Sequence, residues 1–161
     1  MKRVVILGRG AAGKSTLARH LGGITHLPVI ELDKLFWRPG LVPLLRSEWT
    51  ELQQRLVQQD SWILDGDLGT HDVLEVRLHA ADTIVLLDFA FFRCAWRALR
   101  RAPEQLDFWR WVFAYRRQSV PYLRDAISKY APNADLHVLR SPKAVKEFTA
   151  VAASTHRSRV T

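Results

Sequence analysis

The chain has 161 residues, enough for one domain with a sizeable core, and its 48% hydrophobic and 25% charged residues are typical of globular proteins. Its single cysteine, Cys94, excludes an internal disulfide and a cysteine-based zinc site, and fits a reducing, cytoplasmic setting. No apolar run is long enough to span a bilayer. The net charge of +8 predicts attraction to polyanions such as nucleotides, nucleic acid and acidic membrane surfaces, unless it only forms a solvated basic face.

The first predicted strand is the apolar run of residues 4–7, which stops at Gly8 without the cleavage-site pattern of a signal peptide. A glycine-rich loop follows it, and then a helix from near Lys14 to Leu21. This order of strand, loop and helix matches the pattern G-x-x-x-x-G-K-[ST] of a phosphate-binding loop, with an ordinary glycine-rich turn as the alternative. The matching residues are Gly8, Arg9, Gly10, Ala11, Ala12, Gly13, Lys14, Ser15 and Thr16.

The chemistry of this loop predicts a nucleoside triphosphate site. Glycines lack a Cβ, so the chain can curl tightly and aim successive backbone N–H groups at an anion. The following helix adds the positive end of its dipole. Lys14 can reach the β- and γ-phosphates, and Ser15 offers its hydroxyl to Mg²⁺. ATP and Mg²⁺ are therefore the expected cofactors.

Strands and helices alternate along the rest of the chain. Because each strand is nearly all apolar, the pattern predicts a parallel sheet covered by helices on both faces. Residues 1–152 are expected to form a single domain with a short lid at about 93–106, followed by a frayed tail at 153–161. The other expected elements are strands at 27–33, 61–67, 82–88 and 136–139, and helices at 48–59 (capped by Ser47), 71–78, 91–101, 106–119, 122–129 and 143 to about 152.

Acidic residues end three of these strands. Ligands of parallel sheets bind beyond the carboxyl ends of the strands, so Gly8, Asp33, Asp65 and Asp88 are expected along one edge. Asp65, on a strand next to the first, suits a group that orients Mg²⁺ through water beside Ser15. Asp33 is placed to orient or deprotonate an acceptor hydroxyl. Roles as turn or cap residues are the alternatives for both, and Asp88 is predicted to be a capping acid.

Arginines recur at a spacing of four residues in the segment after the strand at 82–88. Arg93, Arg97 and Arg101, with Arg100 beside it, would share one face of a helix. Arginines brought in by a closing segment stabilise the charge that spreads over the transferred phosphoryl group. A solvated face or a nucleic-acid patch is the alternative. The aromatic residues at 108–115 are predicted to pack in the core.

Further stretches accompany the phosphate-binding loop: Leu27-Pro28-Val29-Ile30-Glu31-Leu32-Asp33, Phe36-Trp37-Arg38-Pro39-Gly40, Trp62-Ile63-Leu64-Asp65-Gly66, Ala81-Asp82-Thr83-Ile84-Val85-Leu86-Leu87-Asp88 and Val138-Leu139-Arg140-Ser141. Together they resemble the adenylate-kinase-related bacterial proteins called DNA topology modulation proteins, within the P-loop kinase group. The resemblance covers nearly the whole chain to about Val151. It departs from the group at Asp67-Leu68, where Asn-Tyr is common, and in the short lid between Arg93 and Leu106.

The resemblance implies a three-layer α/β/α P-loop fold of the nucleoside- and nucleotide-kinase type, with a five-stranded parallel sheet. It also implies an ATP site at the loop, an acceptor site near Asp33 and an arginine-bearing lid after the fourth strand. Arg140 would belong to the loop against the adenine ring, and Arg77 would face the acceptor or the γ-phosphate.

The leading hypothesis is phosphoryl transfer from ATP·Mg²⁺ to a small-molecule acceptor, which by analogy is a nucleoside or nucleotide. One alternative is a nucleotide-dependent nucleic-acid-binding protein, suggested by the charge and by the name of the group. Another is an ATP-binding protein without kinase activity, suggested by the short lid. The expected catalytic residues are Lys14, Asp33, Arg93, Arg97 and Arg101, and the expected metal-site residues are Ser15 and Asp65.

Overall fold

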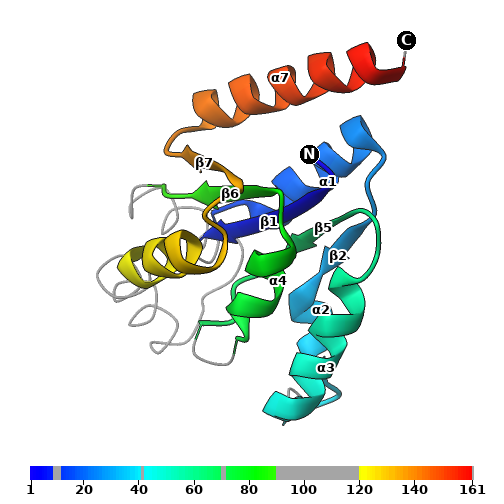
Figure 1. Ribbon diagram of the computed structural model, residues 1–161, viewed down its shortest axis with the longest axis vertical. Coiled ribbons are helices and arrows are strands. Elements are labelled where there is room, and N and C mark those ends of the chain that lie inside the picture. The colour runs from blue at the N-terminus through cyan, green and yellow to red at the C-terminus, as the bar shows by residue number, and fades with distance from the viewer. Residues whose placement is uncertain (9–11, 41, 70–71, 90–119, 161) are drawn as a thin grey trace.

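The computed structural model describes residues 1–8, 12–40, 42–69, 72–89 and 120–160 (Figure 1). For residues 158–160 it describes the backbone only. Among these residues, five strands form one parallel sheet in the order β2-β5-β1-β6-β7. Since all five run in the same direction, their carboxyl ends lie at one edge of the sheet, with β1 at the centre. The strands are β1 (Arg3–Gly8), β2 (Val29–Glu31), β5 (Trp62–Asp65), β6 (Thr83–Leu87) and β7 (Asp135–Leu139).

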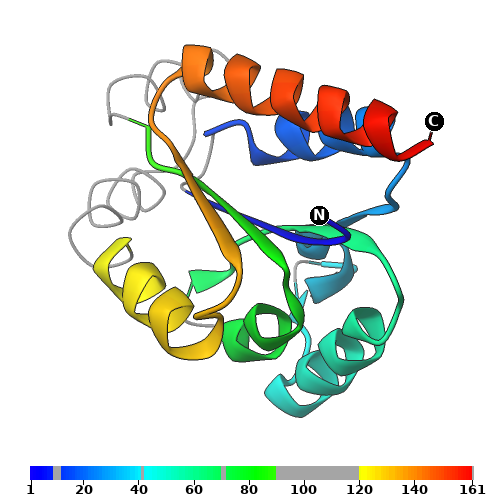
Figure 2. The ribbon, with the colours of Figure 1, turned by 45° about the horizontal axis from the view of Figure 1, so that its top comes forward.

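Helices cover both faces of the sheet (Figures 1 and 2). On one face, α1 (Lys14–Thr25) and α7 (Pro142–Val160) pack side by side. The other face is covered by α2 (Leu32–Phe36), α3 (Arg46–Val57), α4 (Leu74–Ala80) and the helical residues 120–130. This arrangement confirms the predicted α/β/α fold with a five-stranded parallel sheet.

Two apolar cores hold the layers together. Successive side chains of a strand point to opposite faces, so β1 contributes Val4 and Ile6 to one core and Val5 and Leu7 to the other. All four are fully buried, and β1 is therefore fixed from both sides. The core on the α1 face also contains Leu17, Ala18, Leu21 and Leu139, and the opposite core contains Phe36, Trp49, Trp62, Leu78 and Ile127.

Several element boundaries differ from those predicted. The second strand ends at Glu31, and α2 begins at Leu32, so Asp33 lies in the first turn of a helix and not at a strand end. The predicted cap at Ser47 is wrong, because α3 begins at Arg46 and the carboxylate of Glu48 accepts the backbone N–H of Leu45 (3.0 Å). Other differences include the bounds of α4, the end of α7 at Val160 instead of about residue 152, and a short antiparallel pair, β3 (Trp37–Arg38) with β4 (Val42–Pro43).

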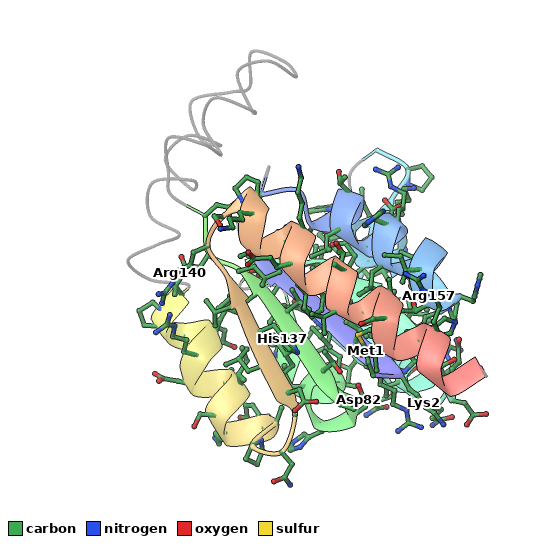
Figure 3. The ribbon with its side chains drawn as sticks, turned by 90° about the horizontal axis from the view of Figure 1, so that it is seen from above. Met1, Lys2, Asp82, His137, Arg140 and Arg157 are labelled. Carbon is green, nitrogen blue, oxygen red and sulfur yellow. The ribbon has the colours of Figure 1, made fainter. Side chains whose placement is uncertain are left out.

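At the amino edge of the sheet, Asp82 precedes β6 and links it to β1. Its carboxylate accepts the backbone N–H groups of Lys2 (2.7 Å) and Arg3 (3.1 Å) and so fixes the start of β1 beside β6. Figure 3 shows Met1, Lys2 and Asp82 together at this edge, whereas Arg140 lies at the opposite, carboxyl edge. In the described part of the chain, no helix has both the length and the apolar character that crossing a membrane requires.

Candidate active site

The phosphate-binding loop leaves the sheet at Gly8, a position that only glycine fits. Gly8 has a φ of +142°, and a Cβ there would lie 2.7 Å from the carbonyl oxygen of Leu87 on β6. The loop ends at Gly13, which has a φ of +96° and precedes the first residue of α1. These two glycines give the chain the bends that a phosphate-binding loop needs. Arg9, Gly10 and Ala11 of the predicted site lie outside the described residues.

Lys14 turns back over this loop. Its Nζ donates a hydrogen bond to the carbonyl oxygen of Gly8 (2.8 Å), which brings a positive charge to the N-terminus of α1. Among the described residues, no side chain caps that N-terminus and its first turn holds no acid. The backbone N–H groups of the first turn are therefore available to an anion. Of the other predicted loop residues, Ala12 is buried and Thr16 is exposed on α1.

Asp65 and Ser15, the two expected metal-site residues, meet beside the start of α1. Asp65 ends β5 directly opposite Ile6 of β1, is 3% exposed, and is hydrogen-bonded by the Ser15 side chain. Burial raises the pKa of Asp65, and Ser15 and the charge of Lys14 offset part of this effect. Its Oδ1 has no hydrogen-bond partner within the described residues. A buried carboxylate oxygen without a partner suits a hydrated cation, so the donor set fits Mg²⁺.

Asp33 faces the same region from α2. Its side chain is exposed, yet enough protein surrounds the carboxylate for desolvation to raise its pKa. The charge of Lys14 lowers that pKa in part, and the charge of Asp67 raises it further. Asp33 is therefore close enough to Lys14 and Asp67 for both charges to act on its carboxylate.

Arg77 does not face the acceptor or the γ-phosphate, contrary to the expectation from the resemblance. It is fully buried, and its two terminal nitrogens each donate a 2.6 Å hydrogen bond to the carboxylate of Asp72. One of them also donates to the carbonyl oxygen of Gly66 (3.1 Å), and the other to Oε1 of Gln53 (3.2 Å). Sequence reasoning did not find Asp72, for which no local signal exists.

The opposite flank of the loop holds a second group of charges. Asp88 lies after β6, 3.6 Å from the Nε of Arg140 and 4.0 Å from a terminal nitrogen of Arg124, so it is an ion-pair partner of both arginines. Its expected role as a capping acid concerns a helix outside the described residues and stays a prediction. With Val120, Pro121 and Asp125, these residues line a pocket of about 610 Å³. Arg140 thus lies at the carboxyl edge, and its expected contact with the adenine ring stays a prediction, whereas Arg124 was missed.

The predicted lid falls outside the described residues, and with it Arg93, Arg97 and Arg101. Their expected role therefore stays a prediction. In the part of the chain that the structure describes, no three His, Cys, Asp or Glu side chains gather as a metal site.

Comparisons with known proteins identify the fold. No family model matches the sequence, and no curated protein matches it. Similar solved structures include a shikimate kinase from Acinetobacter baumannii in complex with shikimate, with a TM-score of 0.69 and 14% identity over 99% of this chain and 94% of that one.

Two further structures are similar over almost their whole length. A gluconokinase from Sinorhizobium meliloti has a TM-score of 0.55 and 14% identity, covering 98% of this chain and 92% of that one. A shikimate kinase from Aquifex aeolicus has a TM-score of 0.52 and 19% identity, covering 95% and 97%. At these identities the likeness establishes a P-loop kinase-like fold, and the activity must be argued from the site.

Proposed function

We propose that this protein is a kinase that transfers the γ-phosphoryl group of ATP to a hydroxyl group of a small molecule. The observation that carries the proposal is the convergence of Lys14, Ser15 and the buried, partnerless oxygen of Asp65 at the uncapped N-terminus of α1. A cation, an N–H cradle and a metal-orienting carboxylate are the parts that bind the donor in phosphoryl transfer.

On the donor side, each residue has a separate task. Lys14 leaves the carbonyl oxygen of Gly8 and neutralises the β- and γ-phosphate oxygens. Ser15 and Asp65 would hold Mg²⁺, Ser15 through its hydroxyl and Asp65 through the carboxylate oxygen that has no hydrogen-bond partner in the described residues. Mg²⁺, when bound with the triphosphate, supplies positive charge to the oxygens of the transferred group. The predicted lid residues Arg93, Arg97 and Arg101 would add charge to the same oxygens.

On the acceptor side, Asp33 orients the attacking hydroxyl and accepts its proton. Its raised pKa is consistent with this task, because a base is most effective when its pKa lies close to the working pH. We propose a nucleoside or nucleotide as the acceptor, together with membership of the DNA topology modulation group, from the motifs that carry the resemblance. The substrates named for the structural neighbours, shikimate and gluconate, likewise offer hydroxyl groups.

The pocket beside β7 is proposed to receive the base of ATP. It lies at the carboxyl edge, across β1 from Asp65 of β5, and Arg140 borders it. A flat, delocalised guanidinium can stack on an adenine ring. The donor would then extend from this pocket along the loop toward Asp33.

The decisive experiment measures ATP turnover with a panel of acceptors: nucleosides, nucleoside monophosphates, shikimate, gluconate and simple sugars. We expect one class to raise turnover, and Lys14→Ala to lower kcat by about 100-fold or more. Lys146→Ala, an exposed lysine of α7, is the matched control and should leave kcat unchanged.

Other outcomes separate the alternatives. If no acceptor raises turnover and Lys14→Ala has no effect, the kinase proposal is wrong. Tight ATP binding without transfer would indicate a nucleotide-binding protein that lacks kinase activity. Binding to duplex DNA that weakens steeply with salt would favour the nucleic-acid hypothesis.

A further inference from the structure

Among the described residues, the buried group around Arg77 is the most highly connected set of side chains outside the proposed donor site. Three side chains bond to one another: Gln53 of α3, Asp72 before α4, and Arg77 of α4. Gln53 accepts a hydrogen bond from Arg77 (3.2 Å) and donates one to Asp72 (3.1 Å), and Asp72 accepts hydrogen bonds from both terminal nitrogens of Arg77. Burial alone would raise the pKa of Asp72, but the Arg77 charge and these hydrogen bonds lower it, so Asp72 is ionised.

This group is poorly suited to a purely stabilising role. Two fully charged groups have been removed from water, and such a pair seldom contributes more than two well-packed apolar side chains of similar volume. The Nε of Arg77 is also buried without a hydrogen-bond partner in the described structure, which adds an uncompensated desolvation cost. What distinguishes the group from an apolar one is that it bonds to the backbone.

The backbone that it holds follows Asp65. Arg77 donates to the carbonyl oxygen of Gly66, and Asp72 accepts the backbone N–H groups of Leu68 (3.4 Å) and Val73 (2.9 Å). Both ends of the segment from Gly66 to Val73 are therefore tied to one buried ion pair.

Gly66 links this segment to the acceptor side. It has a φ of +151°, and a Cβ at Gly66 would lie 2.9 Å from the Cβ of Leu32, the residue before Asp33. Gly66 thus packs directly on Leu32, the first residue of α2, and it follows Asp65 directly in the sequence. A shift of Gly66 would displace the metal-orienting carboxylate and the acceptor carboxylate together.

We propose that Arg77, Asp72 and Gln53 are positioning residues that hold Gly66 in place and so fix the separation of Asp65 and Asp33. The proposal rests on the proposed function for the roles of these two aspartates. None of the three side chains touches the substrate. Their contribution is made through the backbone of residues 66–69 and through the contact of Gly66 with Leu32.

The test replaces the ion pair by an apolar pair, Asp72→Leu with Arg77→Met, and compares it with each single variant and with the control Arg55→Met, an exposed arginine of α3. We expect the single variants to be destabilised and the double variant to recover the unfolding midpoint of the wild type. The acceptor KM of the double variant should rise and its kcat fall, together by roughly 10- to 100-fold in kcat/KM, with the KM for ATP unchanged.

Gln53→Met provides a second test that does not require the double variant to fold. It leaves the ion pair in place and removes one of its supports, so we expect a wild-type unfolding midpoint with a raised acceptor KM. A double variant that is stable and keeps the wild-type acceptor KM would overturn the proposal. So would a double variant as unstable as the single variants, combined with an unchanged acceptor KM in Gln53→Met.

Two measurements test this proposal without any enzyme assay. They remain informative even if the wild type transfers no phosphoryl group, a result that would refute the proposed function but not the positioning role. Exchange of the Leu68 amide hydrogen should accelerate by at least about 10-fold in the double variant, because its carboxylate acceptor is gone. The Asp33 carboxyl, followed by carbon NMR, should titrate at a different pH from the wild type. Wild-type behaviour in both measurements would overturn the proposal.

Discussion

Two arginine–aspartate groups flank the phosphate-binding loop, and they differ in almost every physical respect. On the β5 side, Arg77 and Asp72 are buried and bonded at 2.6 Å. On the β7 side, Arg124 and Arg140 are 47% and 68% exposed, and they approach Asp88 only to 4.0 Å and 3.6 Å. The first group bonds internally and to the backbone carbonyl of Gly66, whereas the second borders a pocket. The buried pair, Arg77 and Asp72, can therefore act only on the protein around it, whereas the exposed Arg124 and Arg140 are accessible from solvent.

The largest expected difference appears when one partner of each group is removed. Arg77→Ala leaves the Asp72 charge buried without its counter-ion and should lower the free energy of unfolding by about 3–5 kcal/mol. Arg124→Ala removes an exposed partner and should cost less than about 1 kcal/mol. Urea unfolding of the two variants measures both values. Equal losses would show that the two groups do not differ in the way their burial indicates.

Asp65 provides a third case, since it is a buried carboxylate that pairs with no arginine of the described residues. Its raised pKa means that the folded protein disfavours the charge that the proposed function uses. Asp65→Asn should therefore stabilise the fold at neutral pH by about 1 kcal/mol, while lowering Mg²⁺-dependent turnover by roughly 10- to 100-fold. Thermal unfolding and a magnesium titration of kcat test the two effects. A destabilised Asp65→Asn would contradict the view that this carboxylate is kept for function.

The stability that Asp72 contributes and the stability that Asp65 contributes should depend on pH in opposite directions. The pKa of Asp72 is lower in the folded state than in the unfolded chain, so the unfolded chain binds more protons in the interval between the two values. The stability that Asp72 contributes is complete above the unfolded pKa and is lost as the pH falls through the folded pKa. Asp65 has the opposite sign, because its folded pKa is raised: its contribution falls as the pH rises through the folded value.

We therefore expect the stability difference between the wild type and Asp65→Asn to widen as the pH rises toward neutrality. The difference between the wild type and Asp72→Asn should instead shrink on acidification. Unfolding midpoints measured from pH 3 to pH 7 would show both trends. Parallel curves for the two variants would contradict the assigned signs.

The sheet, and the start of a helix shortly after its central strand, could be predicted because their signals are local. The apolar run of residues 4–7 and the spacing of Gly8, Gly13 and Lys14 specify a strand, a loop and a helix start without reference to the rest of the chain. The neighbouring position of Asp65 followed from the strand order that such folds share. Its missing hydrogen-bond partner could not be predicted, because that depends on which side chains reach it in three dimensions.

The roles of Asp33 and Arg77 were harder to predict for the same reason. Leu32 and Phe36 are four residues apart and both buried, a helical spacing that the apolar run of residues 27–32 concealed. Arg77 lies in the last turn of a short helix, where arginine is usually exposed. Only the packing of α3 against α4 shows that Gln53 and Asp72 surround it.

The smallest expected effect concerns the open group on the β7 side. Arg140→Ala should weaken ATP binding by about 2- to 5-fold, the contribution of an exposed guanidinium stacked on a ring. Stability should hardly change, because Arg140 is largely in solvent and its contact with Asp88 is long. Calorimetric titration with ATP and with inorganic triphosphate distinguishes a contact to the base from one to the phosphates: only ATP binding should weaken in the first case. If both ligands lose affinity equally, Arg140 acts on the phosphates, and the pocket beside Asp88 is not the site of the base.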